Sequence, residues 1–311
     1  MKDLKRAEKI SRRKKTAKIN TVLIFVCFLL LAVAALYIVR FYVLQKEVEN
    51  DNQRLSDMYR EAMGKPDVDY RITDADEKVP PEDATETEAK EQTEAPVIIT
   101  YPRPPEEIAP EFEKAYEINP DVIGFLHIPA KTVDDIELFV VQKDNEYYLT
   151  HDFYGNEKKS GTLFLDQVNQ IWPQDQHMII YGHNMKNGTM FARLPRYKAL
   201  EYAYNNPFVY FDTLYEKGSF VVVAAIRLPA SEMLTEGFNL RTFTFGETSF
   251  KSFMYDVSQH ALYMTKVGVN ENDQLLSLVT CAYNEDDERF LLITRRIREN
   301  ETEEELRKKI K

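Results

Sequence analysis

The segment LLSLVTCAYNEDDERFLLITRR occupies residues 275–296. Its two apolar runs flank a polar loop, and short apolar runs bounded by turn residues are typical of β-strands. Cys281 ends the first run and Arg289 opens the second. Two adjacent strands joined by this loop would bring the thiol and the guanidinium side by side, although one sequence does not define the pairing register. The segment therefore predicts a sheet with a thiol and a cation at one edge.

The chain has two cysteines, Cys27 and Cys281, so a disulfide framework is excluded. A single cysteine in a large domain is either a small buried hydrophobe or a reactive thiol. A free thiol has a pKa of about 8.5, so cysteine catalysis calls for a nearby histidine or cation. Cys27 lies inside a long apolar run, where it is most simply a lipid-facing or packing residue. Cys281 is the candidate nucleophile.

His183 is the leading candidate for the acid/base partner. It follows the apolar run HMII in the sequence YGHNM, where we expect the glycine to permit a tight turn and the imidazole to project from a strand end. Taken alone, such a histidine is as often a hydrogen-bonded loop residue, so the combination with the thiol carries the interpretation. The remaining histidines are interpreted as structural or solvated: His127, His151, His177 and His260.

Further apolar runs predict a mostly β domain. The expected strands are VIGFLHI, IELFVVQ, GTLFLD, HMIIYGH and SFVVVAAIRL, in addition to the two quoted above. Helical spacing appears over residues 108–118, 188–200 and 249–263. A β-barrel or rolled sheet decorated with helices fits this order. The βαβ rhythm and the glycine-rich phosphate loop of nucleotide-binding folds are absent.

The N-terminus reads as a membrane anchor. Residues 19–43 are predominantly apolar, and the uninterrupted part, residues 21–39, matches the roughly 20 residues that cross a bilayer. The run is longer than the apolar region of a cleaved signal peptide. Residues 1–18 are strongly basic, which predicts a cytoplasmic N-terminus and an extracellular catalytic domain. We therefore expect a single-pass membrane protein with an uncleaved signal anchor.

Composition divides the rest of the chain. Residues 44–105 are expected to form a polar, acidic linker rich in Pro, Glu and Thr, residues 106–298 the catalytic domain, and residues 299–311 a charged tail. The net charge of −11 argues against nucleic acid as a partner. No CxxC or HExxH motif occurs, and the acidic run after Cys281 lacks the spacing of a calcium loop, so we expect no metal and no cofactor.

From about residue 107 onward the chain resembles the class B sortases. The resemblance lies in the order of several motifs: NPDVIGFLHIP, DNEYYLTHDFYG, GTLFLD, YGHNM, LVTCAY and ERFLLITRR. It implies an eight-stranded β-barrel with an N-terminal helical piece and a helix between the sixth and seventh strands. The helix expected over 249–263 fits that insertion. The fold class is thus mostly β with helical additions, preceded by one transmembrane helix.

The resemblance also implies roles for particular residues. By motif position, Cys281, His183 and Arg289 match the family's catalytic trio. Two further positions match the groove that binds the sorting peptide, and a third is expected to help shape the oxyanion pocket; these are Asn145, Leu149 and Thr280. This chain departs from the family pattern at Val279 and Ala282, which flank the Thr-Cys pair, and matches only loosely over residues 227–245. Substrate contacts there stay open.

The implied activity is a cysteine transpeptidase that cleaves a C-terminal sorting motif of surface proteins after threonine. The acyl group would pass through a Cys281 thioester to an amine of a lipid-linked peptidoglycan precursor. Three alternatives stay open: an L,D-transpeptidase, whose cysteine motif differs from VTCAY; a pilin-polymerising sortase; and a catalytically inactive, membrane-tethered binding or assembly module. The exact motif, NPQTN-like or LPXTG-like, does not follow from the sequence.

Overall fold

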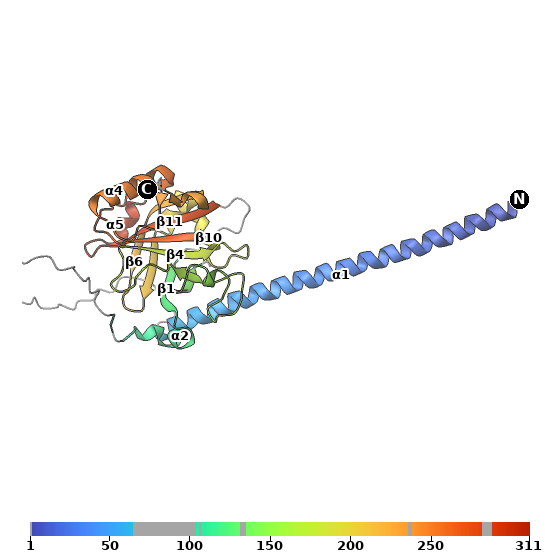
Figure 1. The fold of residues 1–311 in the computed structure, drawn as a ribbon, viewed down its shortest axis with the longest axis horizontal. Coiled ribbons are helices and arrows are strands. Elements are labelled where there is room, and N and C mark those ends of the chain that lie inside the picture. The colour runs from blue at the N-terminus through green and yellow to red at the C-terminus, as the bar shows by residue number, and fades with distance from the viewer. Residues whose placement is uncertain (1, 65–103, 106, 131–134, 236–237, 282–287) are drawn as a thin grey trace, which may run out of the picture. The chain divides into compact units, whose positions relative to one another are not determined.

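The structure is a computed structural model that describes residues 2–64, 104–105, 107–130, 135–235, 238–281 and 288–311, with the side chains of residues 2–24 and of Cys281 left out. It forms a closed β-barrel (Figure 1). Around the ring the order is β11-β10-β4-β3-β2-β1-β5-β6, and β6 pairs back onto β11. A further strand, β9, pairs antiparallel with β6 and stands last in the order of the sheet. The eight-stranded barrel expected from the sequence is confirmed.

The strands coincide with the apolar runs of the sequence. Their bounds are β1 (Val122–Ile128), β2 (Ile136–Val141), β3 (Leu163–Leu165), β4 (His177–His183), β5 (Phe208–Thr213), β6 (Ser219–Pro229), β7 (Leu234–Thr235), β8 (Phe238–Asn239), β9 (Ala261–Met264), β10 (Leu275–Cys281) and β11 (Glu288–Arg296). Every residue of β1 and β5 is buried. Four of these strands were not predicted from the sequence: β5, β7, β8 and β9. The strands β7 and β8 have only two residues each, and β9 directly follows the helix that ends at His260.

Helices decorate the barrel. Their bounds are α1 (Lys2–Ala62), η1 (Pro110–Phe112), α2 (Glu113–Ile118), η2 (Tyr147–Leu149), η3 (Phe191–Lys198), α3 (Leu200–Asn205), η4 (Ala230–Glu232), α4 (Glu247–His260) and α5 (Glu303–Lys308). The helix expected over 249–263 is α4, which ends at His260 before the chain becomes extended. The helix expected over 188–200 is the 3-10 segment η3, since Pro195 interrupts it.

The chain divides into two compact units, Met1–Asp51 and Asn52–Lys311. In the first, α1 includes a stretch that is long and apolar enough to cross a membrane, within Phe25–Ala62. Cys27 is exposed on it. Such a helix near an N-terminus is consistent with the expected anchor.

The last turns of α1, which belong to the second unit, pack into the barrel domain. Leu55 and Tyr59 are buried, and the Tyr59 ring stacks on Phe125 with ring centroids 4.1 Å apart. The Tyr59 hydroxyl donates a hydrogen bond to Asp212, 2.9 Å away. The linker expected over 44–105 includes these turns, so its first part contributes to the hydrophobic core of the domain.

Candidate active site

Three neighbouring strands bring the predicted catalytic residues to one level. Strand β10 lies between β4 and β11 (Figure 1). In the parallel β4–β10 pair, Cys281 is the partner of His183. In the antiparallel β10–β11 pair Val279 faces Leu291, and the same register continued by two residues brings Cys281 level with Arg289. Residues directly opposite on adjacent strands point to the same face of a sheet, so these three positions share one face.

Thr280 locks the pairing of β10 and β11 beside Cys281. Its hydroxyl accepts a hydrogen bond from the backbone N–H of Phe290 at 2.9 Å and lies 3.3 Å from the carbonyl oxygen of the same residue. The side chain is buried. Successive side chains in a strand alternate between faces, so Thr280 points away from the face that Cys281 shares with His183. Its hydroxyl thus holds β11, and with it Arg289, at this level of the sheet.

His183 is buried, and its environment favours the neutral imidazole. Its Nε2 lies 2.6 Å from the carbonyl oxygen of Leu149, so the ring donates this hydrogen bond. Burial lowers the pKa of His183, the hydrogen bond to Leu149 opposes this, and the nearby Arg289 guanidinium lowers the pKa further. Because Nε2 carries the proton, Nδ1 is the basic nitrogen of the neutral ring.

Gly182 serves packing and not a turn. It lies inside β4, one residue before the strand ends at His183, so the prediction of a tight turn here is wrong. A Cβ at this position would overlap Leu163 and would lie 2.7 Å from a ring carbon of Phe191. Both neighbours are fully buried. The absence of a side chain therefore allows β4 to pack closely just before the histidine.

The segment from Asn145 to Leu149 lies beside β4. The Asn145 side chain accepts a hydrogen bond from the backbone N–H of Gln167 at 2.8 Å and lies 3.3 Å from the Asp166 carboxylate. At the other end, the Leu149 carbonyl accepts the hydrogen bond from His183. An open depression of about 660 Å³ adjoins Asn145, lined by Asp144, Asn145, Glu146, Tyr147, Thr150 and Gln167. Both residues expected in the groove thus lie on one segment that ends at the histidine.

Sequence reasoning missed Asp166, which organises this side of the site. The residue follows β3 and is fully buried. Its carboxylate forms an ion pair with Arg241 at 2.9 Å and accepts a hydrogen bond from the Tyr181 hydroxyl at 3.0 Å. The signal in the sequence was an acid placed directly after the apolar run GTLFL. A buried carboxylate needs several donors, and three distant segments provide them here.

The other histidines have structural surroundings. His177 is fully buried, with Nδ1 2.8 Å from the Thr242 carbonyl and Nε2 2.8 Å from the Ser277 hydroxyl. Burial lowers its pKa to about 4. His151 stacks on Tyr147 with ring centroids 4.0 Å apart. His260 is the last residue of α4.

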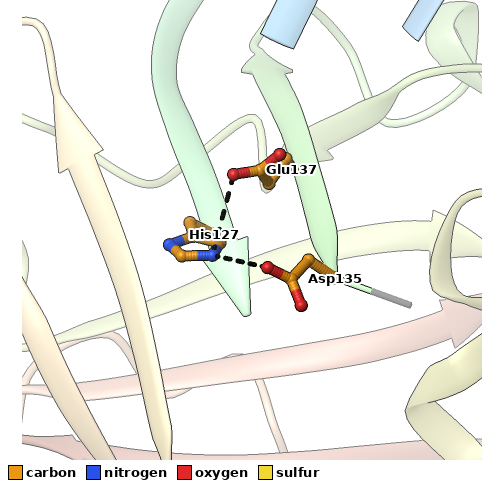
Figure 2. A group of neighbouring side chains, drawn as sticks. All are labelled: His127, Asp135 and Glu137. Carbon is orange, nitrogen blue, oxygen red and sulfur yellow. Dashed lines mark hydrogen bonds and ion pairs between the residues drawn. The ribbon is translucent and has the colours of Figure 1, made fainter. Parts of the chain in front are cut away.

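His127 faces two carboxylates on the barrel wall. Its Nε2 lies 3.5 Å from Asp135 and 3.7 Å from Glu137 (Figure 2). These three ligand atoms are close enough to hold a metal ion. Glu137, however, also forms an ion pair with Arg60 and accepts a hydrogen bond from Ser56, both at the end of α1. The group therefore forms a charged network that joins α1 to β1 and β2.

A sortase domain model matches residues 126–297, more than half of the chain. Sortase B of Listeria monocytogenes is 30% identical over 193 residues, which cover 60% of this chain and 73% of that protein. The chain belongs to the class B sortases. Sortase B of Staphylococcus aureus is 25% identical to this sortase over 196 residues, or 62% of the chain and 77% of the relative. Family membership indicates an enzyme of the transpeptidase type.

Solved sortase B structures share the fold of this sortase. The Staphylococcus aureus sortase B–substrate complex aligns with a TM-score of 0.61 at 20% identity, covering 82% of this chain and 98% of that one. A Bacillus anthracis protein described as similar to sortase B aligns with a TM-score of 0.59 at 22% identity, covering 81% and 96%. These likenesses confirm the barrel with helical additions.

Proposed function

We propose that this sortase is a membrane-anchored cysteine transpeptidase with Cys281 as nucleophile, His183 as acid/base and Arg289 as oxyanion partner. One observation carries the assignment: in the β4–β10–β11 sheet, Cys281 is paired with His183, and the β10–β11 register, continued by two residues beyond the Val279–Leu291 pair, brings it level with Arg289. The nucleophile, the base and the cation thus share one face. The substrate would be the C-terminal sorting motif of a surface protein, cleaved after threonine.

In the first half-reaction, the neutral imidazole of His183 accepts the thiol proton of Cys281. The thiolate attacks the threonine carbonyl, and Arg289 stabilises the negative charge on the carbonyl oxygen. The C–S bond forms, the C–N bond breaks, and His183 returns its proton to the leaving amine. The lowered pKa of His183 suits this transfer, because an imidazolium of lower pKa is a stronger acid and readily gives up its proton.

In the second half-reaction, an amine of a lipid-linked peptidoglycan precursor attacks the thioester. His183, now neutral, accepts the proton of the incoming amine, the new C–N bond forms, and the thiol of Cys281 is restored. Water in place of the amine would give slower hydrolysis. No cofactor takes part in this sequence of steps.

The N-terminal helix would place the enzyme where both substrates are found. The apolar stretch of α1 is proposed to span the membrane, with the basic N-terminus in the cytoplasm and the barrel outside the cell. A surface protein held by its hydrophobic tail and a lipid-linked precursor lie at the same bilayer surface. Anchoring raises the effective concentration of all three without any further contact.

The decisive experiment incubates the full chain, in detergent, with peptides of NPQTN, SPXTG and LPXTG type and an amine acceptor. Mass spectrometry follows the products for the wild type and for Cys281→Ala. We expect cleavage after threonine, a thioester on Cys281 and an amine adduct, all absent in the variant. Cleavage of none of the peptides together with an unreactive Cys281 would favour the inactive binding module.

The choice of acceptor separates wall anchoring from pilus assembly. A second reaction offers a peptidoglycan-type amine and a peptide lysine at equal concentration. Preference for the peptidoglycan amine supports the proposed role, and preference for the lysine supports a pilin-polymerising sortase.

A further inference from the structure

We propose that His127, Asp135 and Glu137 form a binding site for a divalent transition-metal ion such as Zn²⁺, on the barrel wall beside the end of α1. Its role would be structural, because β3 separates β1 and β2 from β4, the strand that carries the proposed base. The ion would tie β1 and β2 to the chain that connects them. This inference does not depend on the proposed function.

The register of β1 and β2 brings three side chains of metal-ligating type to one face of the sheet. His127 is paired directly with Glu137 across the two strands. Asp135 lies two residues before Glu137, so an extended chain points it to the same side. Figure 2 shows the three side chains turned toward one another. The expectation of no metal rested on local sequence motifs, and such motifs do not describe ligands that meet across two strands.

The spacing of the three ligand atoms suits a metal ion better than direct hydrogen bonds. The Nε2 atom of His127 lies 3.5 Å from Oδ2 of Asp135 and 3.7 Å from Oε1 of Glu137. A typical N–H···O hydrogen bond is shorter, about 2.7–3.2 Å. Ligand atoms bonded at about 2.0–2.2 Å to a tetrahedral zinc ion lie about 3.4 Å from one another. The three atoms all lie within 4.8 Å of one another, so small movements would give that spacing.

Each carboxylate is held in place through its other oxygen. The Oδ1 atom of Asp135 accepts a hydrogen bond from the backbone N–H of Ala130 at 2.7 Å. The Oε2 atom of Glu137 accepts one from the Ser56 hydroxyl at 2.9 Å. The His127 ring stacks on Tyr210 with ring centroids 5.8 Å apart. Outer contacts of this kind orient the ligands of metal sites in proteins.

The donor set selects the class of ion. Calcium and magnesium prefer sites made of oxygen atoms alone, whereas an imidazole together with carboxylates suits zinc and its neighbours in the first transition row. The side chains of His127 and Glu137 are 5% and 14% exposed, and that of Asp135 is 37% exposed. An ion would therefore enter from the side of Asp135 and keep water in its remaining position.

Arg60 shares the Glu137 carboxylate and would compete with the ion. Its Nε donates to Oε1 of Glu137 at 3.1 Å, and its Nη2 forms an ion pair with Oε2. An ion on Oε1 would replace the first contact and leave the second. The guanidinium also repels a cation a few ångströms away. Removal of this charge should therefore tighten metal binding, which is the opposite of the effect of losing a ligand.

The test is isothermal titration of the full chain in detergent with ZnCl₂. All proteins carry Cys281→Ala, so that the thiol of the proposed active site does not bind the ion. Asp135→Asn is the cleanest variant, because it removes one ligand charge and leaves the contacts of Glu137 with α1 in place. His127→Gln removes the imidazole, and Arg60→Gln removes the competing charge.

His260→Gln is the matched control. This histidine ends α4, with Nδ1 2.8 Å from the Asp256 carbonyl oxygen. Among the residues that the structure describes, it belongs to no group of three metal-ligating side chains. Zinc bound elsewhere on the chain would appear equally in this variant and in the others.

We expect one strongly bound ion per chain. Asp135→Asn and His127→Gln should each weaken its binding by about tenfold or more, because one of three protein ligands is lost. Arg60→Gln should tighten it about fivefold, and His260→Gln should leave it unchanged. ZnCl₂ should also raise the urea midpoint of unfolding in the parent chain and much less in Asp135→Asn, since the ion binds the folded state.

Three outcomes would overturn the inference. Absence of saturable zinc binding would leave the cluster as a charged network only. Equal affinity in the parent chain and in Asp135→Asn would place the ion elsewhere. Weaker binding in Arg60→Gln would contradict the sharing of the Glu137 oxygen on which the site is built.

Discussion

At the scale of single residues, burial is the main influence on the candidate base His183, and the nearby Arg289 guanidinium acts in the same direction. Burial and the guanidinium both lower the pKa of the imidazole, so the resting state is biased towards a neutral His183. A neutral His183 is ready to accept a proton, as the role proposed for it in the first half-reaction requires.

Removing the Arg289 guanidinium should change both kcat and the pH dependence of kcat/KM. Arg289→Gln is expected to lower kcat by about 100-fold or more, because the developing oxyanion loses its charged donor. The pKa of His183 should rise, since the cation that lowers it is gone. The measurement is the kcat/KM profile against pH, in which the limb that titrates His183 moves to higher pH. Arg289→Lys, which keeps the charge, should leave that limb near its wild-type position.

Gly182 offers a second prediction at this scale. Gly182→Ala should lower the free energy of unfolding by about 1–3 kcal/mol, because the added methyl overlaps Leu163 and Phe191 in the core. Urea unfolding followed by circular dichroism measures the loss. Gly268→Ala is the control, since no heavy atom lies within 4 Å of the Cβ that it would add. Equal stability of the two variants would refute the packing role.

At the scale of elements, β4 joins three parts of the domain. It pairs with β3 and with β10, and its first residue, His177, bonds to the Thr242 carbonyl in the connection between β8 and α4. The Ser277 hydroxyl on β10 completes the contacts of this imidazole. A buried neutral histidine thus ties the connection that carries Arg241 to the strand that carries His183.

This contact predicts acid sensitivity. The unfolded chain protonates His177 near its ordinary pKa of 6.5, whereas the folded protein does so only near 4. Because the pKa is lowered on folding, stability is fully present above pH 6.5 and falls as the pH drops towards 4, by about 3 kcal/mol from this residue. Urea unfolding at pH 7 and pH 4.5 should show a smaller difference for His177→Gln than for the wild type. A comparable reduction in His260→Gln, at the end of α4, would contradict the assignment.

At the scale of the whole molecule, the domain begins earlier in the chain than its composition indicates. Tyr59 contacts three aromatic rings, Phe112, Phe125 and Phe139, and donates a hydrogen bond to the buried Asp212. Its polar neighbours in α1 hold Glu137. The end of α1 therefore covers an apolar surface that the barrel alone would expose.

A truncation series tests this boundary. A chain of residues 104–311 should be less stable than one of residues 52–311 by about 3–5 kcal/mol or more, since the contacts of a fully buried tyrosine are lost. Chemical unfolding measures the difference, and Tyr59→Ala in the longer chain should reproduce much of it. A chain of residues 44–311 should match 52–311. Equal stability of the chains from 104 and from 52 would show that α1 is dispensable for the fold.

The sequence by itself determined the mostly β architecture, the helix before the last strands and the candidate trio. These features depend on local apolar runs and on residue types that lie in or beside them, and such patterns are visible without any partner strand. The apolar N-terminal helix follows from composition in the same way. The order of the motifs also singled out Thr280 and Asn145, although it did not predict which residues they contact.

Only the tertiary structure decided which residues meet. Arg241 and Asp166 are 75 residues apart, and Tyr59 and Asp212 are 153 apart. No periodicity within either segment specifies such a partner, because strand register and helix docking arise from the packing of the whole barrel. The same holds for Gly182, whose neighbours come from β3 and η3. Long-range packing thus brings a recognisable set of candidate catalytic residues together at one level of the sheet.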